Sequence, residues 1–347
     1  MSGGTGTGAG RASRRRAPTS LDVARLAGVS QSTVSYVLTG ARPISDATRR
    51  RVEEAIEQLG YHPNSGARTL RSRRSGVIGL MVPKAHGNDG PLMEFVGAVA
   101  REARRFGYDI LLVTAQEGAR GIDRVVRTGI CEALILMELG KHDERIAPVV
   151  DSGLPFVTLG RPDAVPQGSM VDLDFELLGS MVVDRAEAEG CERLLLFGAM
   201  DGRRERNEIA RFLDGVEVRA RDSALEVLHE RGRAAEAAER AALLTPDGSR
   251  TALFGLTGAP SDLFAYASTG ALTDPRRLFI ALTAEDLLAI SPLLAAVPRV
   301  DPRRTEISEL AVRELVRLLD GDGAAPRVQL VAPRWLEEGA TRADELL

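Results

Sequence analysis

Apolar residues recur with helical spacing in three short segments near the start of the chain, between residues 20 and 59. Each segment follows a serine or a threonine, residue types that cap the amino terminus of a helix. The candidate caps are Thr19 or Ser20, Ser30 and Ser45. The side chains expected inside are Val23, Ala24, Leu26, Ala27, Val34, Val37, Leu38, Val52, Ala55, Ile56 and Leu59. The pattern therefore predicts three helices that share one small core.

Beyond residue 76 the pattern changes to short, continuous apolar runs that alternate with amphipathic segments. Such runs indicate parallel strands covered by helices on both faces. The expected strands are 77–82, 108–113, 133–137, 155–159, 193–198, 251–256, 277–282 and 327–331. The expected helices lie near 96–106, 119–128, 144–152, 177–188, 205–213, 234–243, 261–268 and 305–319. These strands are too many for one sheet, so two doubly wound lobes are predicted, with ligands at the carboxyl ends of the strands.

The formal net charge of −4 is unevenly distributed. Residues 1–76 contain 13 arginines and 5 acidic residues, which gives +8, whereas the remainder carries −12. A small basic module on a large acidic body is typical of a nucleic-acid binder that carries a second domain. The plain alternative is a solvated basic tail, which the helical pattern among the basic residues disfavours.

The first two predicted helices are joined by a short turn in which Gly28 suits the left-handed conformation that ends a helix. This arrangement is that of the helix-turn-helix, whose second helix enters the major groove of DNA. The outward side chains of that helix are Gln31, Ser32, Ser35 and Tyr36. Short polar side chains allow a close approach to base edges. The alternative is an ordinary three-helix capping domain.

The segment 61–76, YHPNSGARTLRSRRSG, is expected to become ordered only on a partner surface. A helix over residues 64–71 would be short, and Gly66 would weaken it. Leu70 stands among arginines, which suits an apolar wedge between base pairs while the arginines hold phosphates. The alternative is a solvated linker between domains.

The predicted fold class is an all-α helix-turn-helix DNA-binding domain plus an α/β core made of two doubly wound parallel-sheet lobes. Residues 1–18 are rich in Gly, Ser, Thr and Arg and are expected to form a disordered tail. The other expected divisions are a helix-turn-helix domain at 19–62, a hinge at 63–75, and a core at 76–347. Within the core, one lobe is expected at about 76–161 plus 300–322 and the other at about 162–299 plus 323–347.

Several motifs of the amino-terminal region occur together in a fixed order. D-V-A, A-G-V-S and T-V-S lie between residues 22 and 35, Y-x-P-N begins at Tyr61, and A-R-x-L begins at Ala67. In these motifs the chain resembles the lactose/galactose-repressor (LacI/GalR) family of bacterial transcription regulators. Core fragments such as GLPFVTLGRP and EGCERLLLFGAM fit the framework of that family. The resemblance implies a core like that of periplasmic sugar-binding proteins and a dimer on a palindromic double-stranded DNA operator.

The resemblance also assigns roles to individual residues. It implies major-groove contacts by Gln31, Ser32, Ser35 and Tyr36. It implies backbone contacts by Thr19, Ser30, Thr33, Thr39, Ser45, Thr48 and Asn64. It implies minor-groove hinge contacts by Ala67, Arg68, Leu70 and Arg71. Tyr36 departs from the family, in which arginine is frequent there; tyrosine cannot grip guanine with two bonds, so the usual half-site is not expected.

A small-molecule effector is implied in the cleft between the lobes. By position in the family, the effector contacts are Arg161, Arg206 and Thr283. The Asn-Asp pair usual in the family is replaced by Thr257 and Gly258, and its cleft aspartate by Thr283 or a close neighbour. Sugar recognition relies on fixed carboxylates and amides, so the expected effector is another kind of molecule, or there is none. Arg206 has the alternative of an ordinary surface ion-pair residue.

Together these expectations describe a sequence-specific DNA-binding regulator, a repressor whose operator affinity responds to an effector. The alternative is a solute-binding protein of the periplasmic class without a role on DNA, which leaves residues 19–74 unexplained. An enzyme is not expected, because the four histidines lie away from any nucleophile motif, and neither metal-ligand spacing nor a phosphate loop is present.

Cellular location and redox state follow from two further features. The chain has no apolar run of about 18 residues and no secretory signal, so a cytoplasmic protein without a membrane partner is expected. Cys131 and Cys191 are isolated, and they are expected to be buried small hydrophobes. No cofactor and no metal are expected.

Overall fold

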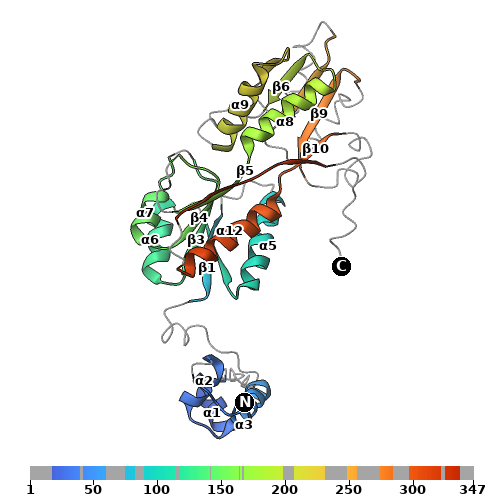
Figure 1. The fold of residues 1–347 in the computed structure, drawn as a ribbon. Helices are drawn as coiled ribbons and strands as arrows, with labels where there is room; N and C mark the ends of the chain where they lie inside the picture. The colour runs from blue at the N-terminus through green and yellow to red at the C-terminus, as the bar shows by residue number, and fades with distance from the viewer. Residues whose placement is uncertain are drawn as a thin grey trace, which may run out of the picture. The chain divides into compact units, whose positions relative to one another are not determined.

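The structure is a computed structural model of the chain. It describes residues 18–39, 42–59, 75–82, 90–114, 118–140, 142–163, 165, 168–197, 207–230, 248–255, 274–283, 297–321 and 325–336. The chain divides into two compact units, Met1–Ser75 and Gly76–Leu347. Their elements are coloured from blue to red along the chain in Figure 1.

The first unit contains the three predicted helices, α1 (Ser20–Ala27), α2 (Gln31–Thr39) and α3 (Asp46–Leu59). Their shared core consists of small and branched apolar side chains. Its buried members are Val23, Ala24, Ala27, Val34, Val37, Val52 and Ala55, and Val29, Ile44, Ile56 and Leu59 pack against it. The predicted helix-turn-helix core is therefore confirmed in most of its residues.

Two leucines that were expected in this core are exposed instead. Leu26 is 49% exposed and Leu38 is 41% exposed. Each lies at the margin of its helix's apolar stripe, about one residue's rotation away from the buried members. Three short helices cover only the middle of such a stripe, so the prediction that these two leucines point inward was wrong.

The helix ends follow the capping residues read from the sequence. Thr19 and Asp22 form a reciprocal capping box at the start of α1, with a bond of 2.9 Å from the Thr19 amide to Asp22. Gly28 ends α1 in the left-handed conformation, with φ of 65°. Ser30 Oγ accepts the Thr33 amide at 3.1 Å, and this bond fixes the start of α2.

The second unit contains two six-stranded sheets, in which every strand pairing is parallel except that between β10 and β12. The first sheet has the order β11-β5-β4-β3-β1-β2. Its strands are β1 (Val77–Val82), β2 (Asp109–Thr114), β3 (Ala133–Met137), β4 (Phe156–Leu159), β5 (Ser169–Leu173) and β11 (Val328–Val331). The helices of this part are α5 (Gly90–Arg105), α6 (Gly118–Thr128), α7 (Ile146–Ser152) and α12 (Arg304–Leu319).

The second sheet has the order β12-β10-β9-β8-β6-β7. Its strands are β6 (Arg193–Phe197), β7 (Glu226–Glu230), β8 (Thr251–Gly255), β9 (Arg277–Leu282), β10 (Arg299–Asp301) and β12 (Arg334–Leu336). Its described helices are α8 (Phe175–Ala188) and α9 (Asn207–Ala220), which lie side by side in Figure 1. The two sheets confirm the predicted α/β core of two parallel lobes.

Three strands fall on the other side of the expected lobe boundary. The residues of β5 and β11 were expected in the second lobe, but these two strands pair with each other, and β5 also pairs with β4 of the first sheet. The residues of β10 were expected at the edge of the first lobe, but this strand pairs with β9 in the second sheet. The chain therefore passes between the sheets after β5, after β10 and after β11. Hydrophobic pattern identifies a strand but not the sheet it joins, and this is why the boundary was misplaced.

Helices α8 and α9 approach closely because a glycine on each helix faces the backbone of the other. A Cβ atom on Gly179 would overlap the carbonyl oxygen of Phe212, and one on Gly215 would overlap that of Glu176. Two helices that touch in this way form a rigid pair. Within the described residues, no helix is long and apolar enough to cross a membrane.

Candidate functional site

The exposed face of α2 is the best-defined candidate site of the first unit. Gln31 and Ser32 are exposed, Ser35 and Tyr36 are half-buried, and the opposite face of the helix buries Val34 and Val37 in the core. The four predicted base-reading residues therefore lie together on one face of α2. We call Gln31, Ser32, Ser35 and Tyr36 the recognition face.

The polar groups around this face are held by short-range hydrogen bonds at the surface. Gln31 Nε2 donates to Ser20 Oγ at 2.9 Å, which connects α2 to the start of α1. The hydroxyl of Ser30 lies 2.8 Å from those of both Ser32 and Thr33. All of these groups are open to water, so a ligand can replace the bonds with little loss of free energy.

Five predicted backbone contacts lie at helix amino termini. Thr19 is at the start of α1, Ser30 and Thr33 are at the start of α2, and Ser45 and Thr48 are at the start of α3. Helix amino termini attract phosphate through their free amides and their dipoles. In this structure Thr19 Oγ1 donates to Asp22 at 2.6 Å.

Not all of the predicted contacts lie in the described part of the chain. Thr39 is the last residue of α2, and its side chain is not described. Asn64 and the four hinge residues Ala67, Arg68, Leu70 and Arg71 lie outside the described residues. The wedge role of Leu70 therefore stays a prediction from the sequence.

The positive charge of the first unit lies outside its helices. Residues 18–59 contain five arginines and five acidic residues, whereas the segments 1–17 and 60–74 contain four arginines each and no acidic residue. Helix α2 has no charged side chain at all. Long-range attraction to phosphate thus depends on the flanking segments, and the helices must act through local contacts.

Arg42 is a residue of this region that sequence reasoning missed. It follows α2, is exposed, and places its guanidinium carbon 5.2 Å from the centre of the Tyr36 ring. This distance is that of a cation–π contact. The sequence signal that could have identified Arg42 was its position as an arginine in the turn after a helix that contains an aromatic residue.

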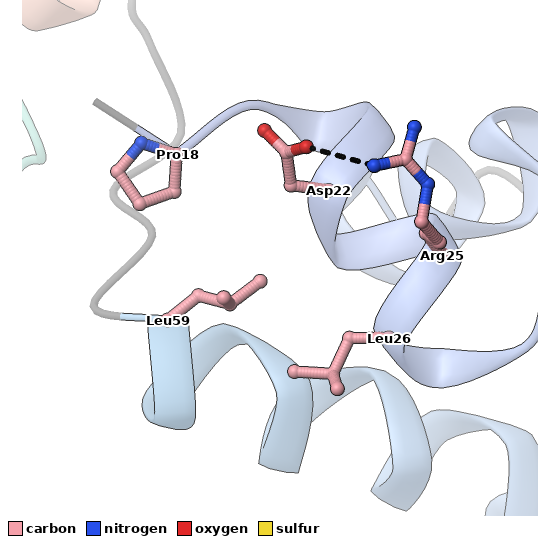
Figure 2. Close-up of a pocket in the computed structure, with 5 residues that line it drawn as sticks. All are labelled: Pro18, Asp22, Arg25, Leu26 and Leu59. Carbon is pink, nitrogen blue, oxygen red and sulfur yellow. Dashed lines mark ion pairs between the residues drawn. The ribbon is translucent and has the colours of Figure 1, made fainter. Parts of the chain in front are cut away.

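A shallow hollow lies elsewhere on the first unit, between α1 and the end of α3 (Figure 2). Pro18, Asp22, Arg25, Leu26 and Leu59 line it, and Asp22 and Arg25 form an ion pair at 3.6 Å. The exposed Leu26 is at this hollow. Of the predicted DNA-contacting residues that the structure describes, none lines it.

Of the predicted effector contacts, Arg161 and Thr283 are described and Arg206 is not. Arg161 follows β4 and Thr283 follows β9, so each stands at the carboxyl end of a strand in its own sheet. This is where ligands bind in doubly wound folds. Thr283 is 2% exposed.

Arg161 is held in a closed group of charges that we call the Arg161 cluster, made of Arg161, Glu176 and Arg211. Glu176 accepts from Arg161 at 3.2 Å and from Arg211 at 3.1 Å. Arg211 Nη2 also donates to the backbone oxygen of Arg161 at 3.3 Å. The cluster links the end of β4 to helices α8 and α9, so Arg161 has a structural role beside its predicted one.

Asp172 of β5 is a buried carboxylate near Arg161 and Arg211, and sequence reasoning missed it. It is 9% exposed, and its Oδ1 accepts the Leu173 amide at 2.9 Å. Its Oδ2 is buried and has no hydrogen-bond partner among the described residues. Burial raises the pKa of Asp172 to about 7, and the nearby Glu208 carboxylate acts in the same direction. Its signal in the sequence was an acidic residue next to apolar residues in the short stretch SMVDL.

The loop after β3 also contacts α9. Asn207, which is 2% exposed, donates from Nδ2 to the Leu139 oxygen at 3.4 Å. In the same loop Arg145 Nη2 donates to the Asp143 carboxylate at 2.8 Å and to the backbone oxygen of Glu138 at 2.7 Å. The strand ends of the first sheet and the first turn of α9 are therefore joined by buried polar contacts.

Metal and thiol chemistry find no support in the described residues. In this part of the chain no three His, Cys, Asp or Glu side chains gather as a metal site would require. Cys131 and Cys191 are buried and unpaired, as expected, and burial raises the pKa of each thiol to about 11. Such thiols are poor nucleophiles at neutral pH.

Comparison with known proteins relates the helix-turn-helix unit to a family of bacterial regulators. The family model "Bacterial regulatory proteins, lacI family" matches residues 19–64. The match covers the three helices of the first unit, so this part of the chain is similar to the LacI family.

Three curated relatives are named as transcriptional regulators. RafR of Escherichia coli is 35% identical over 150 residues, which is 42% of this chain and 44% of that protein. CelR of Thermobifida fusca is 36% identical over 46% of this chain and 49% of that protein. AscG of Escherichia coli K12 is 26% identical over 95% of this chain and 98% of that protein. The matches to the first two relatives thus span about half of their length.

Solved structures show the same fold. A lac repressor dimer bound to operator and an anti-inducer has a TM-score of 0.75 at 20% identity, over 93% of this chain and 98% of that chain. A complex of the regulator CelR with cellobiose has a TM-score of 0.63 at 20% identity, over 93% of this chain and 100% of that chain. At this identity the likeness concerns the fold alone.

Proposed function

We propose that this protein is a sequence-specific DNA-binding transcriptional regulator that represses by binding a palindromic operator as a homodimer. The observation that carries the proposal is the recognition face, a group of uncharged polar side chains on a helix whose other side is buried. It lies in the unit that the family model matches. DNA is its partner, the site of action is the cytoplasm where that DNA lies, and no catalytic step is required.

The expected contacts follow from the chemistry of base edges. Gln31 has an amide that can form two bonds with adenine, and Ser32 can donate to or accept from several bases. The bonds of Gln31 to Ser20 and of Ser32 to Ser30 would be exchanged for bonds to DNA. The arginine-rich flanking segments would supply the salt-dependent attraction to phosphate.

Selection of bound fragments from a random double-stranded library tests this proposal. The full-length chain should enrich an inverted repeat, protect it in footprinting, and bind it as two subunits. Affinity for the selected sequence should exceed that for unrelated DNA by about a thousandfold or more at physiological salt. Enrichment of no common sequence, or one subunit per site, would contradict the proposal.

Gln31→Ala is the first predicted variant. It should weaken binding to the selected operator about ten- to hundredfold and change the preferred base at one position of each half-site, because the variant loses the amide. Its affinity for unrelated DNA should stay the same. Gln58→Ala, which truncates an exposed glutamine on α3, is the matched control and should bind like the unaltered chain.

We further propose that a small molecule binds the second unit at the carboxyl ends of its strands, near Arg161 and Thr283, and changes operator affinity. CelR, a relative, was solved with cellobiose. Repeating the operator titration with cellobiose, other oligosaccharides and anionic metabolites tests this step. A coupling of about 1–3 kcal/mol, or roughly 5- to 150-fold in affinity, is typical of such regulation. If operator affinity stays constant across the panel, the proposed effector is contradicted, whereas the proposed DNA recognition is not.

The alternative, a solute-binding protein without a role on DNA, predicts the opposite pair of results. It requires tight binding of a small molecule by the second unit and no sequence enriched by the first. The same two experiments therefore separate the two functions.

A further inference from the structure

The recognition face lacks a cation of its own. Helix α2 reads QSTVSYVLT and carries no charged side chain. Arginine bound to guanine through two parallel bonds is the most frequent specific contact in the major groove. A recognition helix without arginine must therefore leave guanine unread or obtain a guanidinium from elsewhere in the unit.

The structure places such a group on this face. Arg42 lies beyond the end of α2, before α3 begins at Asp46, and its guanidinium carbon is 5.2 Å from the Tyr36 ring centre. Tyr36 is one helical turn from Ser32, so the two share a row of the recognition face. The stack brings Arg42 to the edge of that row.

Stacking leaves the donors of Arg42 available. A guanidinium that lies over an aromatic ring uses its flat face, whereas its N–H groups point outward in its own plane. Within the described residues Arg42 has no carboxylate partner, whereas Arg25 of the same unit is paired with Asp22 at 3.6 Å. Arg42 is thus a positioned cation whose donors are not used by the described part of the chain.

We propose that Arg42 is a specificity-determining residue that reads guanine in the major groove, with Tyr36 as its positioning residue. The inference rests on the proposed DNA-binding function and deepens it. The ring limits the guanidinium to the neighbourhood of the recognition face. Base reading therefore fits this placement better than a loose contact with phosphate.

The test combines library selection with affinity measurements on the full-length chain. Arg42→Ala should reduce the preference for guanine at one position of each half-site by about ten- to hundredfold, without a change in the salt dependence of binding. Arg42→Lys should show a similar loss of preference, because lysine keeps the charge but lacks the planar fork. Arg25→Ala removes the same charge elsewhere in the unit and should leave the preference unchanged.

Variants of Tyr36 test the positioning role. Tyr36→Phe keeps the ring and should retain the guanine preference, whereas Tyr36→Leu should lose a large part of it. The double variant Tyr36→Leu with Arg42→Ala should lose no more of the guanine preference than Arg42→Ala alone, because both changes remove one contact. Circular dichroism of each variant verifies that the helices remain folded.

Three results would overturn the inference. A loss that is uniform across sequences, with the salt slope smaller by about one, would make Arg42 a phosphate contact. If Arg42→Ala keeps the guanine preference of the unaltered chain, Arg42 does not read guanine. If the unaltered chain enriches no sequence at all, the proposed function fails first and the inference fails with it.

Discussion

The two units of the chain use their polar side chains in opposite ways. In the first unit the polar contacts are local and exposed, as in the Arg25–Asp22 pair, whose side chains are 75% and 38% exposed. In the second unit several are buried, as in the pair of Arg145 with Asp143, whose side chains are 6% and 10% exposed. Exposed contacts contribute little to stability and can be exchanged, whereas buried ones fix a geometry because neither partner can be left alone. The first unit is therefore suited to exchanging its hydrogen bonds for bonds to a ligand, whereas the buried contacts of the second unit hold its structure in place.

The largest loss of stability is expected when a buried contact of the second unit is removed by Glu314→Ala. Glu314 is 4% exposed and binds Ser169 and Arg317. Burial raises its pKa, but the hydrogen bonds from Arg317 and Ser169, together with the charges of Arg317 and Arg327, outweigh burial and bring the pKa below the ordinary value. The variant removes the buried carboxylate to which Ser169 and Arg317 donate, and should lower the free energy of unfolding by about 3–5 kcal/mol.

Urea unfolding followed by the fluorescence of Trp335 measures this loss, because the single tryptophan of the chain lies in β12 of the second unit. Glu309→Ala on the same helix is the matched control. Its ion pair with Arg313 is half open to water, with side chains 31% and 49% exposed, and its loss should stay below about 1 kcal/mol. Equal losses in the two variants would refute the contrast between buried and exposed pairs.

A smaller effect, of opposite sign, is expected from Asp172→Asn. The pKa of Asp172 is raised to about 7 in the folded chain, against an ordinary value near 4. The folded state therefore binds more protons than the unfolded state between these values, and this carboxyl makes the protein less stable as pH rises from 4 to 7. The variant should be more stable than the unaltered chain by about 2–4 kcal/mol at pH 7.5, and the difference should vanish near pH 3.5.

Unfolding curves of the two proteins at each pH, again followed by Trp335, give this difference directly. Asp163→Asn removes the same charge from an exposed position and separates burial from net charge. A stability difference for Asp172→Asn that does not vary with pH would show that the carboxylate is paired in solution.

The smallest effect is expected in the first unit, from Thr19→Ala. The variant removes one half of the capping box of α1 and should lower the local stability of that helix by about 1 kcal/mol. Amide hydrogen exchange of the peptide that spans α1 should become about fivefold faster, while peptides from β3 should be unchanged. Thr19→Ser keeps the hydroxyl and should restore protection. Unaltered exchange in Thr19→Ala would show that the exposed cap is dispensable.

Local features of the fold were predictable because their causes lie within a few residues. The three helices of the first unit, the caps at Thr19, Ser30 and Ser45, and strands such as β1, β3 and β9 agree with the residues named from periodicity. Strands β5, β7, β10 and β12 were not predicted. In β5 and β7 polar residues interrupt or flank a short apolar run, so no continuous apolar pattern marks them. Strands β10 and β12 have only three residues each, which is too short for a pattern.

The candidate site divides in the same way. Helical rotation alone places Gln31, Ser32, Ser35 and Tyr36 on one face, so the recognition face was predicted as a set. The stack of Arg42 on Tyr36 depends on how the turn after α2 folds back, and no spacing rule gives that. The Arg161 cluster likewise joins residues up to 50 positions apart.

By itself the sequence determined the helix-turn-helix, its outward face, the alternation of strands and helices, and the resemblance to a family of regulators. Each of these depends on side chains within one or two helical turns or on the residue types of a motif. Only the tertiary structure decided which strands share a sheet, that Leu26 and Leu38 stay exposed, and that Ser169 meets Glu314 across 145 positions of chain. Such contacts depend on the packing of whole elements, whose free energy is shared among many residues far apart in the sequence.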